Sequence, residues 1–341
     1  MSERLEDIAA AIVATGKGLL AADESTATIK KRLDSIGVES TEASRRDYRQ
    51  MLFSAEEAMR SFISGVILYE ETLFQKASDG RPLTEIIRAA GAIPGIKVDT
   101  GAKPMANFPG EKITEGLDGL ADRLAKYREA GARFAKWRGV IAVSDVLPSY
   151  GAIKANAHAL ARYAALCQQA GIVPIVEPEV LMDGEPGDHS ILRSQDVTEE
   201  TLRITFEELA GQRVRLEGMI LKPSMVIDGK KARGASIEEV AERTMRVLKR
   251  TVPAAVPGIA FLSGGQSTEE ATAHLSAINA LGHHPWKLTF SYGRALQAEA
   301  LAAWGGKPEN VAAGQRAFVH RAKMCSLAAK GEWKKEMESA A

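Results

Sequence analysis

The sequence predicts a single-domain (β/α)8 barrel, in which eight parallel strands close into a cylinder surrounded by helices. Eight short β-rich runs alternate with segments of helical spacing. This alternation is typical of βαβ units, and a count of eight favours a closed barrel over an open sheet. No linker rich in Pro or Ser, charge block or strong internal repeat divides the 341 residues. Barrels of this kind commonly carry about 250 residues or more as one domain.

The eight predicted strands are short apolar runs, several of which end in charged or glycine residues. Runs of this length and composition are typical of buried strands. In chain order they are GLLAADE (18–24), SGVILYEE (64–71), GIKVD (95–99), FAKWRGVIAV (134–143), IVPIVEPEV (172–180), GMILKPSM (218–225), GIAFLSGG (258–265) and KLTFSYGR (287–294).

The predicted helices lie between these runs, where apolar residues recur at helical spacing. They cover residues 119–130, 156–170, 198–213, 236–250 and 268–280, and a further helix covers 308–330. Thr198 and Ser267 resemble capped helix starts, because two acidic residues lie within the first turn after each of them. The final residues GEWKKEMESAA are polar and lack periodicity. We therefore predict a barrel domain over 1–330 and a mobile C-terminal tail over 331–341.

Composition excludes several classes of function. The 44 basic residues balance 44 acidic residues, which removes the broad attraction that nonspecific nucleic-acid or anionic membrane binding needs. No apolar stretch approaches the roughly 18 to 20 residues of a membrane span, and the N-terminus lacks the order of a signal peptide. Cys167 and Cys325 are too few for a disulfide framework, although one bridge stays open. We expect a cytoplasmic protein that binds neither nucleic acid nor membrane.

Charged residues occur late in strands whose inward faces should be apolar. Residues two apart in a strand share a face, and three such charged pairs are present: Lys97 with Asp99, Lys136 with Arg138, and Glu177 with Glu179. Inward-facing charges must gather at an open end of the barrel, since its interior is a packed apolar core. The pairs therefore predict a polar cluster at the C-terminal mouth, where barrel enzymes keep their active sites.

Asp23 and Lys222, from two further strands, extend this cluster. A structural role as an ion pair that caps the barrel would explain any single charged pair about as well as a functional role does. Charged residues from five strands at one mouth, however, favour a functional site. A lysine crowded by other cations loses part of its preference for the protonated form, which makes its amine a nucleophile near neutral pH. Lys222, which follows the apolar residues 219–221, fits this role.

The last two strands end in signals for phosphate binding. Ser263, Gly264 and Gly265 precede one helical segment, and Gly293 and Arg294 begin another. Backbone N–H groups at a helix N-terminus bind phosphate, and barrels commonly place such a site after strands seven and eight. An isolated Gly-Gly is more often a simple turn. The prediction of a phosphate site therefore depends on the position of this pair, directly after the seventh strand.

Metal and cofactor chemistry finds no support in the sequence. The six histidines show no metal-binding spacing, and no nucleophile elbow, P-loop or GxGxxG motif is present. Asp188 and His189 lie in the stretch DGEPGDH, whose Gly and Pro residues favour a surface loop over a metal ligand or a catalytic dyad. We expect no metal and no cofactor.

Several longer stretches, spread in order from about residue 15 to about residue 330, are distinctive: LAADEST, RRDYRQ, ETLFQKASDGRP, GIKVD, FAKWR, ARYAALCQQAGIVPIVEPE, LKPSM, RTVPAAVPGIAFLSGGQS and LTFSYGRALQ. They resemble the class I fructose-1,6-bisphosphate aldolase family. The resemblance implies a homotetrameric barrel that reversibly cleaves fructose 1,6-bisphosphate to dihydroxyacetone phosphate and glyceraldehyde 3-phosphate without a metal.

Carried over motif by motif, the resemblance also implies residue roles. Lys222 is the Schiff-base lysine, Glu177 the general acid and base, and Asp23 a carboxylate that assists carbon–carbon cleavage. Glu179 and Lys136 complete the charged centre. The implied site for the C1 phosphate comprises Ser263, Gly264, Gly265, Ser291, Gly293 and Arg294. The implied C6 phosphate region comprises Ser25, Thr28, Lys97 and Arg138, and Arg32 is a further implied phosphate contact.

The sequence departs from many eukaryotic relatives at its end. Their terminal tyrosine helps to protonate the enamine, whereas the last tyrosine here is Tyr292, so proton return must differ.

Two other interpretations of the function stay open. One is an aldolase that prefers fructose 1-phosphate or sedoheptulose 1,7-bisphosphate. The other is a barrel retained for binding without turnover, which predicts damage to a catalytic set that is here complete.

Overall fold

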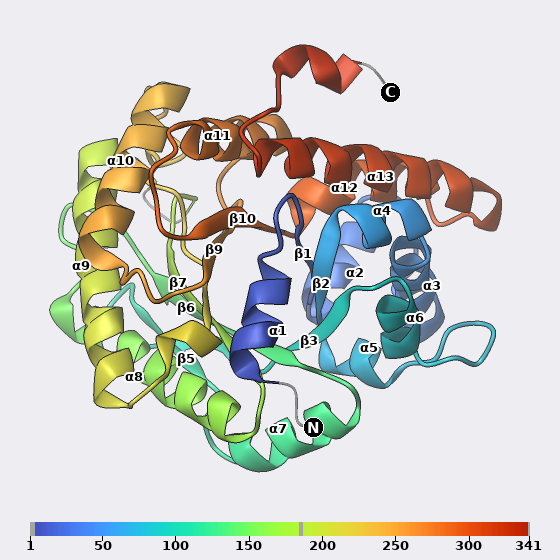
Figure 1. Ribbon diagram of the computed structural model, residues 1–341, viewed down its shortest axis with the longest axis horizontal. Helices are drawn as coiled ribbons and strands as arrows, with labels where there is room; N and C mark the ends of the chain where they lie inside the picture. The colour runs from blue at the N-terminus through green and yellow to red at the C-terminus, as the bar shows by residue number, and fades with distance from the viewer. Residues whose placement is uncertain (1–3, 184–186, 340–341) are drawn as a thin grey trace.

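A closed barrel of eight parallel strands forms the centre of the molecule (Figure 1). The computed structural model describes residues 4–183 and 187–339. The predicted fold class and all the predicted strands are confirmed, and β1 closes the barrel by pairing with β10. The barrel strands are β1 (Gly18–Ala22), β2 (Ile63–Leu68), β3 (Ile93–Lys97), β6 (Phe134–Ile141), β7 (Val173–Val180), β8 (Ile220–Leu221), β9 (Gly258–Phe261) and β10 (Lys287–Tyr292).

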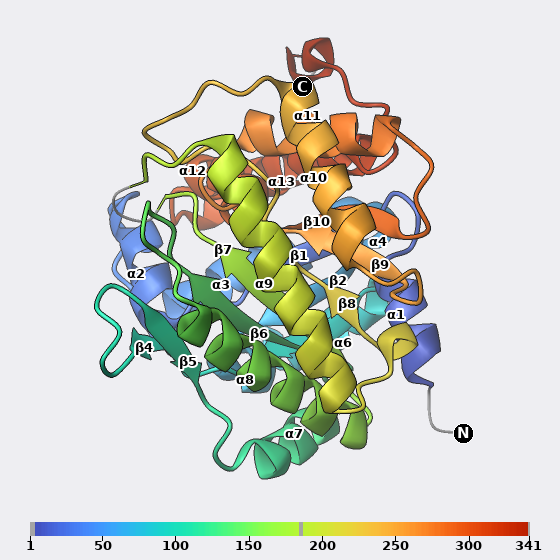
Figure 2. The same ribbon diagram turned by 90° about the vertical axis from the view of Figure 1, so that its left-hand side faces the viewer.

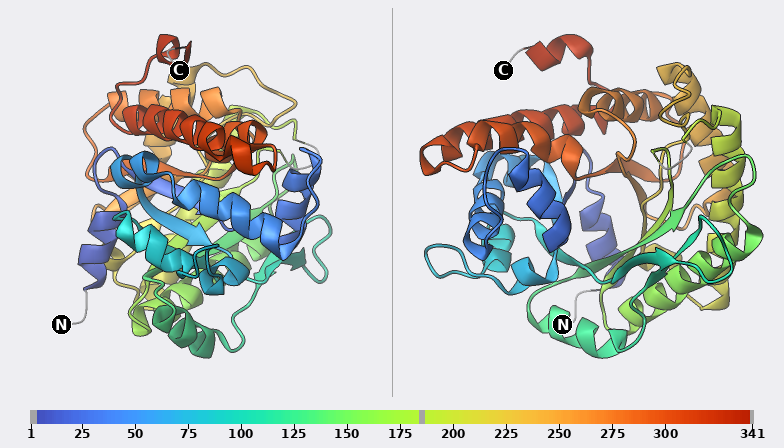
Figure 3. Two further views of the ribbon diagram at one scale, coloured as in Figure 1. Left: turned by 90° about the vertical axis from the view of Figure 1, so that its right-hand side faces the viewer. Right: turned by 180° about the vertical axis from the view of Figure 1, so that it is seen from behind.

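Helices surround the barrel in every view (Figure 3). A two-stranded hairpin, β4 (Gly101–Pro104) with β5 (Lys112–Glu115), follows β3. The α-helices are α1 (Leu5–Ile12), α2 (Thr26–Asp34), α3 (Glu42–Phe53), α4 (Glu56–Ser61), α5 (Glu70–Phe74), α6 (Leu83–Ala89), α7 (Leu120–Glu129), α8 (Tyr150–Gln169), α9 (Ile191–Gly211), α10 (Ile237–Thr251), α11 (Thr268–Ala280), α12 (Arg294–Trp304) and α13 (Val311–Ala328). Short 3-10 helices are η1 (Leu216–Gly218), η2 (Pro308–Asn310) and η3 (Lys335–Ser339).

Every predicted helical segment is helical, but two helices begin earlier than predicted. The helix α8 begins at Tyr150, and α9 begins at Ile191, where the side chain of Ser190 accepts the N-cap hydrogen bond. The predicted cap at Thr198 is therefore wrong. Thr198 lies inside α9, and its hydroxyl donates to the carbonyl of Ser194 at 2.6 Å. The predicted start at Ser267 is confirmed, as a capping box with Glu270.

The helix α1 closes the N-terminal end of the barrel. Its buried residues Leu5, Ile8 and Ile12 belong to one apolar cluster with Phe134 of β6 and Val173 of β7. Figure 2 shows α1 at one end of the barrel, with α2 and the β4–β5 hairpin at the other. Access to the barrel interior is therefore left to the end where the strands finish.

The ring of Phe134 fills the barrel beside two neighbouring strands, β3 and β2. A Cβ atom added at Gly95 would lie 2.1 Å from Phe134 Cε2, and one at Gly65 would lie 2.9 Å from Phe134 Cε1. Distances this short exclude any side chain, so both strands carry glycine at this level. The large ring of Phe134 therefore fits inside the barrel only because both neighbouring positions are glycine.

We expect Gly95→Ala to lower the free energy of unfolding by about 2 to 3 kcal/mol, because overpacking displaces Phe134 inside a closed barrel. The guanidinium unfolding midpoint measures this change. Gly211→Ala is the matched control, since Gly211 ends α9 and has open space around it. Alanine there should leave the midpoint unchanged or raise it slightly. An unchanged midpoint for Gly95→Ala would contradict the packing argument.

The C-terminal segment contains regular structure that the sequence did not predict. The short helix η3 forms, and Glu338 within it accepts a hydrogen bond from the indole nitrogen of Trp333 at 2.8 Å and pairs with Arg321 of α13. Residues 340–341 lie outside the described part of the chain. The mobility predicted for 331–341 stays a prediction, which amide hydrogen exchange can test.

Two further features bear on the environment of the chain. Cys167 and Cys325 are both buried free thiols, so the single bridge that the sequence left open is not formed. Among the residues described, none of the helices is long and apolar enough to cross a membrane.

Candidate active site

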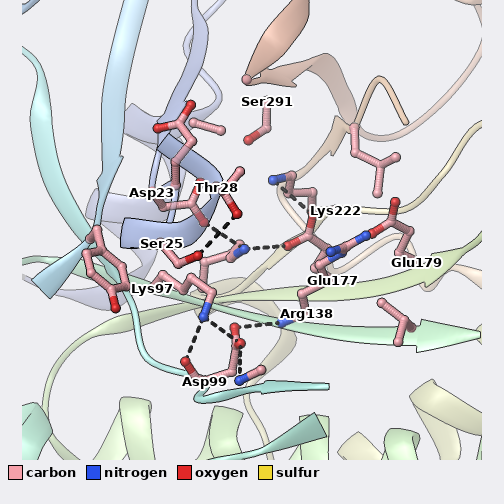
Figure 4. Close-up of a pocket in the computed structure, with 18 of the residues that line it drawn as sticks. Asp23, Ser25, Thr28, Lys97, Asp99, Arg138, Glu177, Glu179, Lys222 and Ser291 are labelled. Atoms are coloured by element: carbon pink, nitrogen blue, oxygen red, sulfur yellow. Dashed lines mark hydrogen bonds and ion pairs between the residues drawn. The ribbon is translucent and has the colours of Figure 1, made fainter. Parts of the chain in front are cut away.

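A cavity of about 880 Å³ opens at the C-terminal ends of the barrel strands. Every residue that the sequence predicted for the site lines this one cavity, although the residues come from widely separated parts of the chain (Figure 4). They are Asp23, Ser25, Thr28, Arg32, Lys97, Lys136, Arg138, Glu177, Glu179, Lys222, Ser263, Gly264, Gly265, Ser291, Gly293 and Arg294.

The alternation of side chains along β6 explains how charges come to face the cavity. Lys136 and Arg138 point inward, whereas Trp137 between them points to the outer layer, where its ring lies 5.6 Å from that of Tyr163 on α8. In the neighbouring strand β7, Glu177 pairs in register with Arg138. The outward tryptophan anchors β6 against the helices, so the inward charges are held on a rigid strand.

Four charges of alternating sign, of which only that of Asp23 is partly exposed, form the centre of the cavity. Lys136 Nζ lies 2.8 Å from Asp23 Oδ2 and 3.2 Å from Glu177 Oε2. Lys222 Nζ lies 3.0 Å from Glu177 Oε1. Lys136, Glu177 and Lys222 are each less than 5% exposed. Charges buried this deeply are tolerated because each has a partner of opposite sign. We call these four residues the central charge network.

The network fixes the charge of three of its members. Burial alone would raise the pKa of Asp23, but Lys136 and then Lys222 outweigh burial and hold that pKa well below its usual range. For Glu177 too, burial opposes the same two lysines, and its pKa is lowered. Burial opposes the charge of Lys136, but Asp23 and Glu177 raise its pKa well above the usual value. Both carboxylates are therefore ionised at neutral pH and can accept protons, while Lys136 stays an ammonium ion.

A second group of cationic side chains lies beside the network. Arg138 pairs with Glu179. Lys97 Nζ lies 2.7 Å from both the carboxylate and the backbone carbonyl of Asp99. Asp99 also accepts from the backbone N–H of Arg138 at 3.4 Å. These contacts fix an ammonium and a guanidinium group at one edge of the cavity (Figure 4), where an anion would be attracted.

Close by, the hydroxyl groups of Ser25 and Thr28 lie 3.1 Å apart at the start of α2. Both line the same cavity as Lys97 and Arg138. Hydroxyl groups donate hydrogen bonds to anionic oxygens, so this part of the cavity combines positive charge with donors.

Next to Glu179, the loop of residues 262–267 connects β9 to α11. A Cβ atom at Gly264 would lie 2.9 Å from Glu179 Oε1, and one at Gly265 would lie 2.8 Å from Met182 Cβ. Gly265 also has a φ of +73°, which favours glycine. This loop brings bare backbone to the cavity at the N-terminus of a helix, where anions are favoured.

Two side chains from the last strand and its helix complete this region. The buried hydroxyl of Ser291 has no hydrogen-bond partner within the described part of the chain. Arg294 begins α12, lines the cavity and donates to the carbonyl of Gln266 at 3.2 Å. A buried donor without a partner is unusual, and here it points to a ligand.

The sequence did not predict every residue that shapes the cavity. Glu24, next to Asp23 in the chain, pairs with Arg32 and accepts from Gln297 of α12 at 3.0 Å. Its position beside a predicted carboxylate was a usable signal. Arg123 and Tyr127 of α7 also line the cavity, but the local sequence gives no sign of it. Asp99 appeared in a charged pair, yet was not assigned to the site.

The expected surface position of His189 is wrong. Its side chain is buried, at 4% exposure, and its Nε2 lies 3.5 Å from Met182 Sδ. The backbone explains this burial, because the carbonyl of His189 accepts from Gly229 at 2.9 Å and draws the loop inward. Within residues 4–183 and 187–339, no group of three His, Cys, Asp or Glu side chains could hold a metal ion.

Comparison with known proteins gives consistent matches. The family model described as fructose-bisphosphate aldolase class-I matches residues 4–341. A probable fructose-bisphosphate aldolase class 1 from Xanthomonas axonopodis pv. citri (strain 306) is 55% identical over 334 residues, which cover 97% of this chain and 99% of that protein. Fructose-bisphosphate aldolase from Drosophila melanogaster is 54% identical over 334 residues, or 98% of this chain and 92% of that protein.

A solved structure is also similar over nearly the whole chain. It is a ternary complex of fructose-bisphosphate aldolase from Plasmodium falciparum with TRAP and a small molecule inhibitor. The two chains share 50% sequence identity and a TM-score of 0.94, and the match covers 97% of this chain and 95% of that chain. The likeness therefore extends to the whole barrel.

Proposed function

The chain belongs to the class I fructose-bisphosphate aldolase family, and from this premise we propose that Lys222 forms the Schiff base during aldol cleavage. The reaction is the reversible conversion of fructose 1,6-bisphosphate to dihydroxyacetone phosphate and glyceraldehyde 3-phosphate. The observation that carries the assignment is the position of Lys222 Nζ, 3.0 Å from Glu177 in a buried network at the barrel mouth. A lyase of this class needs an amine beside a group that moves protons.

The reason for an imine lies in the bond that breaks. Cleavage between C3 and C4 leaves an electron pair on C3, which a protonated imine at C2 accepts far better than a ketone does. Lys222 must lose a proton to attack C2, and Glu177 is placed to take it. Glu177 then returns a proton as water leaves the carbinolamine. Asp23 or Glu177, both ionised, accepts the C4 hydroxyl proton as the bond breaks.

The second half of the reaction releases the two products in turn. Glyceraldehyde 3-phosphate leaves first, and the electron pair that it leaves behind forms an enamine on Lys222. Protonation at C3 and hydrolysis of the imine then release dihydroxyacetone phosphate and restore the amine. Lys136 stays protonated throughout and keeps Asp23 and Glu177 ionised.

The two anion-attracting regions suit a substrate with a phosphate at each end. We assign the C1 phosphate to the loop 263–265 with Ser291, Gly293 and Arg294, and Arg32 as a further contact. The C6 phosphate goes to Ser25, Thr28, Lys97 and Arg138. The unpartnered hydroxyl of Ser291 supports the first assignment, and the fixed cations Lys97 and Arg138 support the second.

Borohydride trapping tests the central assignment. The unaltered chain is incubated with dihydroxyacetone phosphate and sodium borohydride, with and without EDTA, and the product is examined by intact mass and peptide mapping. We expect one adduct per chain, on Lys222, in both conditions, because only the reduction of a covalent imine leaves the ligand permanently attached to the chain. An adduct elsewhere, or none, would contradict the assignment of Lys222, and loss of the adduct in EDTA would indicate metal chemistry.

Relative cleavage rates address the rival ketose substrates. Fructose 1-phosphate lacks the second phosphate, so Lys97→Met should slow cleavage of fructose 1,6-bisphosphate at low concentration far more than cleavage of fructose 1-phosphate. An equal effect on both would contradict the role of Lys97 as a phosphate ligand. Sedoheptulose 1,7-bisphosphate keeps both phosphates, and its rate measures the tolerance of the cavity for a longer chain.

We also propose a cytoplasmic homotetramer. Two buried free thiols suit a reducing compartment, and the family resemblance supports the tetramer. Light scattering coupled to size exclusion measures the mass of the assembly, and a monomeric mass would contradict the tetramer.

A further inference from the structure

Two loops that the proposed mechanism does not use are joined beside the loop of residues 262–267, which we call the phosphate loop. The described residues of the first loop include Met182, Gly187 and His189, and the second loop begins at Gly229. Three backbone hydrogen bonds connect them. The N–H of Gly229 donates to the carbonyl oxygen of His189 at 2.9 Å, that of Lys230 to the carbonyl oxygen of Met182 at 2.8 Å, and that of Lys231 to the carbonyl oxygen of Gly187 at 2.8 Å. These bonds tie the described residues of the first loop to the start of the second.

The joined loops pack closely against their neighbours. A Cβ atom at Gly229 would lie 2.5 Å from the carbonyl oxygen of Gly187. The contact between Gly265 and Met182 is also too close for a side chain, at 2.8 Å for an added Cβ atom. The helix α10, which follows the second loop, lies beside α11 (Figures 1 and 2). The second loop is thus connected to the phosphate loop through the first loop, by backbone hydrogen bonds and by the contact of Met182 with Gly265.

This packing places Arg233 on the outside of the phosphate loop. Its guanidinium donates to the carbonyl oxygen of Gly265. Arg233 is exposed and does not line the cavity, whereas Gly265 does. The arginine therefore contacts the phosphate loop from behind and restrains the peptide that Gly265 shares with Gln266.

The charge of Arg233 also matters, because α11 carries acidic residues near the phosphate loop. Glu270 accepts from the backbone N–H of Ser267 at 2.7 Å. This bond, against burial, lowers the pKa of Glu270, and the charge of Arg233 lowers it further. Glu270 is therefore ionised a few residues from a site that should bind a dianion. A guanidinium beside it offsets part of the repulsion.

We propose that Arg233 is a positioning residue for the phosphate of dihydroxyacetone phosphate, a role that rests on the proposed function. Arg233 does not touch the substrate. It holds the Gly265 carbonyl, keeps the loop's N–H groups aimed at the cavity, and balances Glu270. Its loss should weaken binding of phosphorylated ligands without changing the chemistry at Lys222.

Two ligands that differ only by the phosphate test this role. Borohydride inactivation is measured against concentration for dihydroxyacetone phosphate and for dihydroxyacetone, in the unaltered chain and in Arg233→Ala. For the phosphorylated ligand, the half-saturating concentration should rise on the order of tenfold, because charged hydrogen bonds of this kind carry about that factor. The limiting rate should stay within about twofold, and the values for dihydroxyacetone should not change.

Matched variants separate this role from a general structural one. Arg233→Lys keeps the charge and a donor, and should restore most of the affinity. Arg246→Ala removes an exposed arginine from α10, and should leave both ligands unaffected. Equal weakening of both ligands in Arg233→Ala, or no weakening of either, would overturn the proposal.

The proposed function fails separately. If the unaltered chain formed no adduct with either ligand, the Schiff-base assignment would be wrong. The role of Arg233 would then be tested by calorimetry, which measures the binding of inorganic phosphate to the unaltered chain and to Arg233→Ala. Weakening on the order of tenfold in Arg233→Ala would still support the role, and unchanged binding would overturn it.

Discussion

Replacing Lys222 with methionine should lower kcat for fructose 1,6-bisphosphate cleavage on the order of 10⁵-fold or more, since no imine can form without the amine. Methionine has a similar length and no charge, so the cavity keeps its shape. Removing the ammonium also leaves Glu177 with Lys136 as its one remaining ion-pair partner in the central charge network. Cleavage is measured by coupled assay, and borohydride with dihydroxyacetone phosphate should leave the mass of the variant unchanged.

Lys222→Arg is the control that keeps the charge. Its guanidinium can still pair with Glu177, but it stays protonated and cannot act as a nucleophile. We expect this variant to be as inactive as Lys222→Met while retaining the stability of the unaltered chain. Turnover within tenfold of normal in either variant would show that another amine forms the imine. Lys136 would then be the nearest candidate, because it shares Glu177 as a partner.

The barrel and its mouth could be predicted from the sequence because both rest on short-range patterns. Alternation along a strand places Lys136 and Arg138 on one face. In a closed apolar barrel, charged side chains on the inward face can be solvated only at an open end, which here is the C-terminal mouth. No knowledge of the partner strands is needed for this step. The glycines of the loop 263–265 could be placed in the same way, since a strand precedes them and a helix follows.

Helix starts were less predictable because polar residues inside a helix imitate caps. Thr198 is followed by two acidic residues, as at a true N-terminus, but it lies one turn or more inside α9 and bonds to Ser194. The real cap, Ser190, follows a loop whose own position depends on Gly229. A local sequence cannot reveal which of two capping patterns the tertiary contacts select.

Contacts between distant residues were beyond prediction for the same reason. Glu24 meets Gln297, and Arg233 meets Gly265, only after the barrel has closed. Nothing near Arg233 in the sequence distinguishes it from other exposed arginines. Such residues are found from geometry, whereas the charges on the strands are found from spacing.

Replacing Lys136 with methionine should lower kcat at pH 7 on the order of 10³-fold, and the loss should depend strongly on pH. With its ammonium removed, burial raises the pKa of Asp23 and of Glu177 with less opposition, since Lys136 is the largest opposing influence on both. The reaction needs these carboxylates ionised. The acid limb of the kcat profile should therefore move to higher pH, and activity should partly recover as the pH rises.

Lys97→Met is the matched control for this shift. It removes a second lysine from the same cavity, but that lysine forms its ion pair with Asp99 and has only a minor influence on Asp23. We expect a higher KM with the acid limb unmoved. If Lys136→Met and Lys97→Met shifted the limb equally, the general positive charge of the cavity, and not the contacts of Lys136, would set the protonation of the carboxylates.

Stability should respond to pH in the opposite direction in Lys136→Met. A carboxyl group whose pKa is higher in the folded than in the unfolded chain stabilises the fold below its unfolded pKa, and this contribution is lost as the pH rises through the folded pKa. The variant should therefore become less stable over the range in which its activity recovers. Adding Asp23→Asn should remove part of that pH dependence, because Asp23, which has lost Lys136 as its partner, is then replaced by a neutral residue, whereas Glu177 keeps Lys222. If the unfolding midpoint and kcat of Lys136→Met both rose with pH, the proposed opposition between burial and Lys136 would be contradicted.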